Sequence, residues 1–324
     1  MRRRSFIAAS GAALFFGRPA RADSRPPRIA FIAPGPASNP SSIRQRDTFL
    51  AELAKCGWPQ SAIDFRAYYA TGAVVDFAAS VREAISGEPD VIVAISGSTL
   101  AALKGEKRIP IVFDQVTDPL SQGFVESLAH PGGNITGFSY FDASLGGKWL
   151  ALLKQLVPTL SRVACLFNPD TAASANFYLR VLAQAGTAVG VTVEAAPVHG
   201  NEDIAAALQG AAARGAGFME LPDGFLGGRA SILVAEMLRN RVPGFFFLVS
   251  QVPQGGLISY AVDEVQQAAN AADYVDRILR GERPADLPVQ SPTKFTLAIN
   301  LKTARALGVT VPTGLIAAAD QVIE

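Results

Sequence analysis

The chain has 324 residues, of which 49% are apolar and 18% are charged, and its formal net charge is +1. This composition is typical of a well-buried α/β protein and excludes a mostly disordered chain. The length exceeds what one compact core usually holds, so we expect two lobes.

Residues 1–22 are predicted to be an export signal. An arginine run at 2–4 precedes an apolar segment, 6–16, which is too short to span a bilayer, and residues 20–22 form a small-x-small cleavage site. The Arg-Arg-Ser-Phe-Ile run at 3–7 is similar to a twin-arginine signal, but a general secretory signal would look alike. No cysteine follows the cleavage site, so we expect a periplasmic, soluble protein without a lipid anchor.

Removal of this segment changes the charge balance, because it holds five arginines and no acid. The predicted mature chain carries 24 Lys plus Arg against 28 Asp plus Glu, a net charge of −4. A mildly acidic surface without a basic patch argues against nucleic acid as a partner.

Two cysteines, Cys56 and Cys165, fall in different predicted lobes. Export makes a disulfide possible, but two separate buried thiols fit the pattern better. Neither cysteine has the His, Cys or acidic spacing of a metal site, and no phosphate-binding or dinucleotide motif occurs. We therefore expect no metal and no cofactor.

From Arg28 the chain alternates strands and helices. The first set of expected strands is 29–33, 63–69, 90–95, 109–113 and 134–140, with helices at about 41–56 and 74–85 and a further helix start near 98. The runs at 90–95 and 109–113 are almost wholly apolar, which is typical of strands buried on both faces of a parallel sheet.

The same pattern then begins again. The second set of strands is 162–167, 191–198, 217–221 and 244–248, with helices at 172–189, 203–214 and 230–240. Two successive sets of βαβ units predict an α/β protein of two doubly wound lobes, each with its own parallel sheet.

Glycine pairs at 132–133 and 255–256 each precede a short β-branched strand at a lobe boundary. Hinge residues must absorb changes in φ and ψ, so we expect these strands to form a multi-strand hinge; two ordinary tight turns are the alternative. A helix after Asp263, a strand at 294–299 and a helix at 301–307 are the last elements that we expect. We assign the N-terminal lobe to residues 26–138 plus 257–283 and the C-terminal lobe to 139–256 plus 284–324.

Four stretches resemble one known family. They are IPIVFDQVTDPLSQGFV from Ile109, GGNITGFS from Gly132, GGLISYAVD from Gly255 and PTKFTLAINLKTARALGVTVP from Pro292. In order and over nearly the whole mature chain, they are similar to ABC-transporter substrate-binding proteins, whose characterised members include tryptophan- and tyrosine-binding lipoproteins. The resemblance implies a monomeric, type I-like periplasmic binding protein that delivers a small solute to a permease and ATPase pair at the inner membrane.

The expected ligand site lies outside the carboxyl ends of the strands, where helix N-termini also point. The candidate residues of the first lobe are Ser38, Asn39, Ser96, Ser98, Thr99, Asp114 and Asp118; those of the second are Asn168, Asp170, Asp223, Phe225 and Ser250; Tyr140 and Tyr260 flank the hinge. Each of the polar residues, taken alone, could instead be a helix cap or turn former.

The ligand expected from these residues is a small zwitterion or carboxylate. The helix start at Ser98 and Thr99 favours a carboxylate, an acid such as Asp223 could accept a ligand amine, and aromatic side chains could cover an apolar body. Because aromatic rings and acids also suit sugars, a sugar remains the alternative.

An enzyme and a sensor are the competing functions. The run Ser96-Gly97-Ser98 resembles part of a nucleophile elbow, but Ala94 stands where that motif needs glycine. His130 and His199 lie in predicted turns and are poorly placed as bases. We expect no enzyme, whereas an exported sensory ligand-binding protein stays open.

Overall fold

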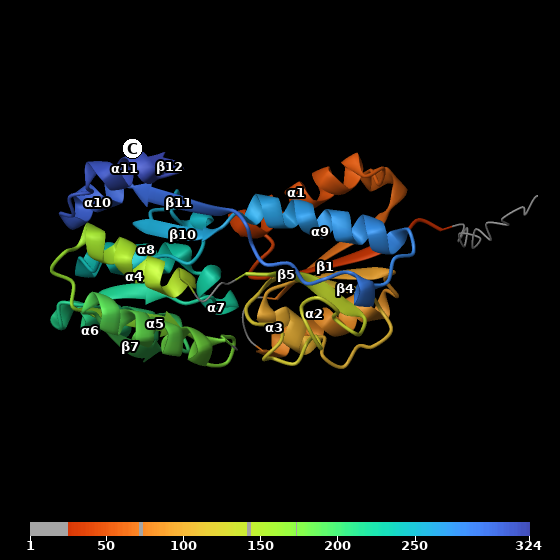
Figure 1. Ribbon diagram of the computed structural model, residues 1–324, viewed down its shortest axis with the longest axis horizontal. Helices are drawn as coiled ribbons and strands as arrows, with labels where there is room; N and C mark the ends of the chain where they lie inside the picture. Colours follow the sequence, from red (N-terminus) through yellow and green to blue (C-terminus); the bar gives the residue numbers. More distant parts are fainter. Residues whose placement is uncertain (1–24, 71–73, 141–143, 173) are drawn as a thin grey trace, which may run out of the picture.

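The computed structural model describes residues 25–70, 74–140, 144–172 and 174–324, so the predicted export signal at 1–22 lies outside the described residues. The described chain forms two α/β lobes that lie side by side (Figure 1). Among these residues, no helix combines the length and the apolar character needed to cross a membrane.

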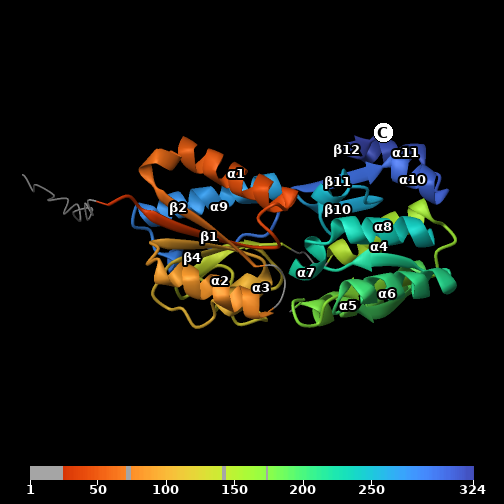
Figure 2. The same cartoon turned by 180° about the vertical axis from the view of Figure 1, so that it is seen from behind.

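The first lobe is built on a parallel sheet in the order β2-β1-β3-β4-β5. Its strands are β1 (Arg28–Pro34), β2 (Asp64–Ala70), β3 (Val91–Ile95), β4 (Ile111–Val116) and β5 (Ile135–Ser139). Helices α1 (Pro40–Lys55) and α9 (Glu264–Leu279) cover one face, and α2 (Val74–Ser86) and α3 (Gly97–Ala102) cover the other (Figure 2). The predicted parallel sheet of this lobe is confirmed.

Burial on both faces explains the apolar runs. Along β3, Val91 and Val93 pack in the cluster under α1 and α9, whereas Ile92 and Ala94 pack in the cluster under α2 and α3. Because successive side chains of a strand point to opposite faces, a sheet covered by helices on both sides needs apolar residues at every position.

The second lobe has a seven-stranded sheet in the order β12-β11-β10-β9-β8-β6-β7. Its strands are β6 (Arg162–Phe167), β7 (Thr192–Pro197), β8 (Gly217–Glu220), β9 (Gly244–Phe245), β10 (Ile258–Val262), β11 (Phe295–Asn300) and β12 (Gln321–Ile323). All neighbours are parallel except β10 and β11.

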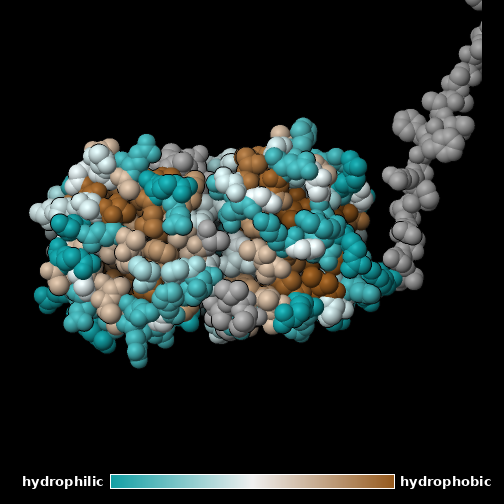
Figure 3. All heavy atoms as spheres, turned by 90° about the horizontal axis from the view of Figure 1, so that it is seen from below, coloured by the Kyte–Doolittle hydropathy of each residue, from teal (hydrophilic) through white to brown (hydrophobic). Residues whose placement is uncertain are grey.

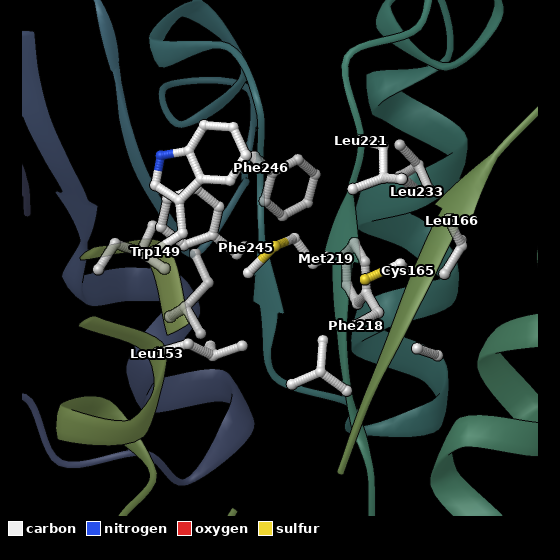
Figure 4. Close-up of a cluster of buried hydrophobic side chains, with 14 of the residues drawn as sticks. Trp149, Leu153, Cys165, Leu166, Phe218, Met219, Leu221, Leu233, Phe245 and Phe246 are labelled. Carbon is white, nitrogen blue, oxygen red and sulfur yellow. The ribbon is translucent and has the colours of Figure 1, made fainter. Parts of the chain in front are cut away.

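The helices of the second lobe enclose one large core. They are α4 (Ser144–Leu156), α5 (Ala175–Val189), α6 (Asn201–Ala213), α7 (Gly224–Gly227), α8 (Ala230–Asn240), α10 (Leu301–Leu307) and α11 (Thr313–Ala318). Trp149 of α4, Phe245 of β9 and Met219 of β8 point toward one another in this core (Figure 4). Cys165 is buried there as a free thiol, and Cys56 is a half-buried free thiol in the first lobe.

The lobe boundaries differ from the predicted ones. Residues 257–283 were assigned to the first lobe, yet β10 pairs with β9 and β11 in the second sheet, and only α9 packs on the first. Residues 284–324 were assigned to the second lobe, yet Leu287 and Val289 are buried in the first-lobe clusters. The chain therefore crosses between the lobes after β5, after β10 and before β11.

The glycine pairs do not lie at these crossings. Gly132, with φ of +85°, precedes β5, and Gly255, with φ of +114°, precedes β10, whereas the chain leaves each strand at its other end. The pairs are turns that lead into the strands, which was the alternative interpretation of the sequence. The hinge strands were recognised correctly, but the glycines mark their far ends.

Candidate functional site

A cavity lies between the lobes, where the carboxyl ends of the two sheets face each other. Its empty volume is about 680 Å³, including its opening to solvent. Both lobes line it, through Pro34, Asn39, Ser42, Gln45, Ser96, Gly97, Ser98, Gln115, Thr117, Gln122, Thr171, Ser174, Pro222, Asp223, Gly224, Gly227, Gly228, Phe247 and Leu248. Of the residues predicted from the sequence, this lining includes Asn39, Ser96, Ser98 and Asp223.

The start of α1 and the residue before it place three polar residues in the cavity lining. Asn39 stands just before the helix and its carbonyl oxygen accepts the amide of Ile43. Ser42 and Gln45 follow at three-residue spacing, which places them on one face of the helix. Both are almost fully buried, and the Ser42 hydroxyl donates to the carbonyl oxygen of Pro34. Gln45 therefore extends a buried amide to the ligand space.

The loop after β3 contributes two hydroxyls with different tasks. Ser96 has a φ of +84°, and its Oγ caps α3 by accepting the amide of Thr99 at 3.4 Å. Thr99 is fully buried, and its hydroxyl lies 3.2 Å from Ser96 Oγ, so it supports the cap and does not line the cavity. Ser98 reaches across to the second lobe and donates to the carbonyl oxygen of Thr171 at 2.6 Å.

A β-bulge decides which side chain of β4 enters the cavity. The pairing with β5 shifts between Phe113 and Val116, and Gln115 has a φ of +59°. Gln115 consequently lines the cavity, whereas Asp114 turns into the protein and is fully buried. Asp114 Oδ1 accepts the Gln115 amide at 2.7 Å, and its Oδ2 has no hydrogen-bond partner in the described chain. Burial, aided by the charge of Glu264, raises the pKa of Asp114 to about 7.

Asp223 organises the wall of the second lobe. Its carboxylate accepts the amide of Asn168 at 2.9 Å, the Thr171 hydroxyl at 2.5 Å and the amide of Phe225 at 3.0 Å, and so caps α7. Burial raises the pKa of Asp223, while these hydrogen bonds act in the opposite direction. Among the lining residues described, Asp223 is the one carboxylate, and none of them is Lys, Arg, His or Cys.

Several other predicted residues form turns outside the cavity lining. Ser38 is exposed, Asp118 Oδ1 accepts the Ser121 amide, and Asn168 Oδ1 accepts the amide of Asp170. Asp170 is itself exposed, 3.3 Å from His199. These roles match the cap and turn alternatives that the sequence left open.

The predicted aromatic residues also lie outside the lining. Tyr140 is buried against Phe247, with ring centroids 5.2 Å apart. Phe225 lies under the guanidinium of Arg229, and Tyr260 stacks on Phe295. Ser250 is buried, and its hydroxyl has no hydrogen-bond partner in the described chain. Phe247, which the sequence did not single out, is the one aromatic residue among the described residues that line the cavity.

Glu220 supports this wall from beneath. It ends β8, is fully buried, and accepts the Phe247 amide at 3.4 Å and the Gln251 side-chain amide at 3.0 Å. Gln251 in turn accepts the Leu248 amide at 3.0 Å. Glu220 and Gln251 thus hold the backbone amides of Phe247 and Leu248. Burial raises the pKa of Glu220 to about 8.

Comparison with known proteins gives a consistent result. The family model described as ABC transporter substrate binding protein matches residues 32–323. A curated tyrosine-binding protein of Clostridioides difficile (strain R20291) is 27% identical over 237 residues, which cover 69% of this chain. The aligned chain spans 64% of that relative's own length, less than two thirds.

Three solved structures share the fold. A conserved domain protein from Vibrio cholerae O1 biovar El Tor is 27% identical, with a TM-score of 0.85 over 92% of this chain and 100% of the other. An ABC domain from Streptococcus pneumonia in complex with L-Trp is 23% identical, with a TM-score of 0.85 and the same coverage. A ligand-free, open substrate-binding protein from Clostridium difficile is 21% identical, with a TM-score of 0.65 over 92% and 99%.

The buried Glu220 carboxyl predicts a pH dependence of stability. The unfolded chain releases this proton near the ordinary pKa of 4.5, whereas the folded protein keeps it up to about pH 8. The contribution of Glu220 to stability is therefore fully present below pH 4.5 and is lost as pH rises to about 8. The free energy of unfolding of Glu220→Gln should decrease by roughly a few kcal/mol less than that of the wild type between pH 4.5 and 9. Urea unfolding across this range measures the difference. The exposed Glu202→Gln is the control and should keep the wild-type profile; equal profiles for all three proteins would contradict the assignment.

Proposed function

Since the chain belongs to the ABC transporter substrate-binding protein family, we propose that it is the solute-binding component of an importer. It takes up a small solute between its lobes in the periplasm and delivers it to a permease and ATPase pair. The observation that carries this proposal is the cavity lined by polar groups from both lobes. A ligand that contacts both walls favours the closed arrangement over an open one, which is how binding is linked to a change of shape.

The ligand we propose is a small amino-acid-like zwitterion. The first lobe offers the side-chain amides of Gln45 and Gln115, which can donate to a ligand carboxylate. The second lobe offers Asp223, whose charge favours a ligand amine. Phe247 and Leu248 supply an apolar surface for a side chain between these ends. The tyrosine-binding relative supports the same ligand class.

Catalysis is a weaker explanation of the same cavity. Acyl or proton transfer needs a nucleophile or a base placed beside the substrate. The described lining holds no histidine, lysine or cysteine, and Asp223 already accepts hydrogen bonds from three groups of the protein. A binding role therefore suits these residues better. We propose that the protein acts as a monomer, since one chain supplies both walls of the cavity.

A thermal-shift panel of amino acids, aromatic acids, amines and sugars tests the ligand class. We expect amino acids to raise the melting temperature, because a ligand at one hundred times its Kd adds about 2.7 kcal/mol of stability. Bound ligand should first be removed by unfolding and refolding. A rise with uncharged sugars alone would contradict the zwitterion proposal.

Substitutions in α1 and in the segment before it test the position of the site. Gln45→Ala removes a buried amide that lines the cavity, so the ligand found in the panel should bind about tenfold more weakly by calorimetry. Ser38→Ala, at an exposed residue outside the lining, should leave the affinity unchanged. The reverse pattern would place the ligand outside this cavity.

A further inference from the structure

Direct hydrogen bonds join the lobes without a ligand atom, and two of them lie within the described residues. One runs from Ser98 of the first lobe to the carbonyl oxygen of Thr171 in the second, at 2.6 Å. The other joins the hydroxyls of Thr117 and Tyr178 at 2.5 Å. Thr117 follows β4 in the first lobe, and Tyr178 lies on α5 in the second. Both bonds are made wholly by the protein, so they contribute to closure whatever the solute is.

Thr117, the first-lobe partner of Tyr178, is held in place by its own loop. The side-chain amide of Gln122 donates to the carbonyl oxygen of Thr117, and Asp118 adopts a φ of +46°. Asp118 Oδ1 accepts the amide of Ser121, and Phe124 closes the turn through the carbonyl oxygen of Pro119. The loop therefore presents the Thr117 hydroxyl in a fixed direction, and it gives Asp118 a positioning task.

The second-lobe partner belongs to the core. Tyr178 is fully buried, and its ring stacks on Trp149 of α4 with centroids 5.9 Å apart and an interplanar angle of 17°. Trp149 also contacts Phe245 and donates to the carbonyl oxygen of Tyr260. Tyr178 is not among the residues that line the cavity, whereas Thr117 is. Tyr178 therefore meets the first lobe through Thr117, a residue that lines the cavity, without lining the cavity itself.

Glycines allow the two lobes to approach each other closely at the boundary between them, which we call the seam. A Cβ on Gly224 of the second lobe would lie 3.1 Å from the Pro34 Cβ and 3.5 Å from Phe77 of the first lobe. The backbones of Gly35 and Gly228 also come together, since a Cβ on Gly228 would lie 3.8 Å from the Gly35 Cα. The two lobes are therefore packed closely enough for short direct hydrogen bonds across the seam.

We propose that Tyr178 is a positioning residue for closure. Its hydrogen bond to Thr117 stabilises the closed arrangement in which the solute is held, and so raises the affinity for every solute by the same factor. This proposal rests on the proposed binding function, because it assigns Tyr178 a part in the closure of the same cavity. The equal factor follows because apparent affinity scales with the populated fraction of the binding-competent state.

The test compares Tyr178→Phe and Thr117→Val with the wild type. Tyr178→Phe keeps the ring that stacks on Trp149 and removes only the hydroxyl. It should weaken the binding of each solute on the order of fivefold, the effect of one hydrogen bond. Because Thr117 lines the cavity, Thr117→Val is assessed without solute: added to Tyr178→Phe, it should expand the ligand-free protein little further, because both changes remove the same bond.

Tyr274→Phe is the matched control. Like Tyr178, Tyr274 is a buried tyrosine with a hydrogen-bonded hydroxyl. This hydroxyl donates to the carbonyl oxygen of Pro288 at 2.6 Å, and both groups lie in the first lobe. This variant should lose stability without losing affinity. An unchanged affinity in Tyr178→Phe, or a loss that differs from one solute to another, would overturn the proposal.

A measurement without any solute separates this proposal from the proposed function. The ligand-free Tyr178→Phe protein should have a larger radius of gyration than the ligand-free wild type, as measured by small-angle scattering, because its closed form is less populated. Tyr274→Phe should match the wild type. An identical radius for Tyr178→Phe and the wild type would overturn the role of Tyr178, even if the solute panel succeeds. A larger radius would support it, even if no solute of the panel binds.

Discussion

The buried carboxylate of Asp223 is the constraint on which the cavity depends. A carboxylate removed from water is costly unless its oxygens accept hydrogen bonds. Asp223 meets this need through the amide of Asn168, the hydroxyl of Thr171 and the amide of Phe225. These bonds fix the loops after β6 and β8 against each other. Thr171, held in this way, also accepts a hydrogen bond at its carbonyl oxygen from the Ser98 hydroxyl of the first lobe. The Asp223 carboxylate therefore supports both the second-lobe wall of the cavity and the contact between the lobes.

The fold could be predicted because its signals are local and repeated. Apolar runs such as Val91–Ile95 are typical of strands that are covered on both faces, and helices cover both faces of this sheet. The boundaries between the lobes were harder, because β10 and α9 are adjacent in sequence and pack on different sheets. Nothing in an apolar strand or an amphipathic helix states which of two similar sheets it joins.

The candidate site was predicted in part, for a related reason. The rule that ligands lie beyond the carboxyl ends of strands leads to the correct loops, and Asn39, Ser96, Ser98 and Asp223 line the cavity. It cannot say which side chain of a loop faces inward. At β4 a bulge places Gln115, and not Asp114, in the cavity lining. Gln45 lies more than a turn into α1, where the sequence alone predicts that a polar residue is exposed to solvent. Closure itself uses Tyr178, which looks like an ordinary core residue in the sequence.

The central claim is that a solute held between the lobes keeps them closed. Small-angle scattering of the wild-type protein, with and without saturating ligand, tests it most directly. Two lobes joined by a few chain crossings move by default, so the ligand-free protein should be more expanded than the complex. The complex should fit the closed arrangement in which Ser98 reaches Thr171. Superimposable profiles at saturating ligand would contradict the account.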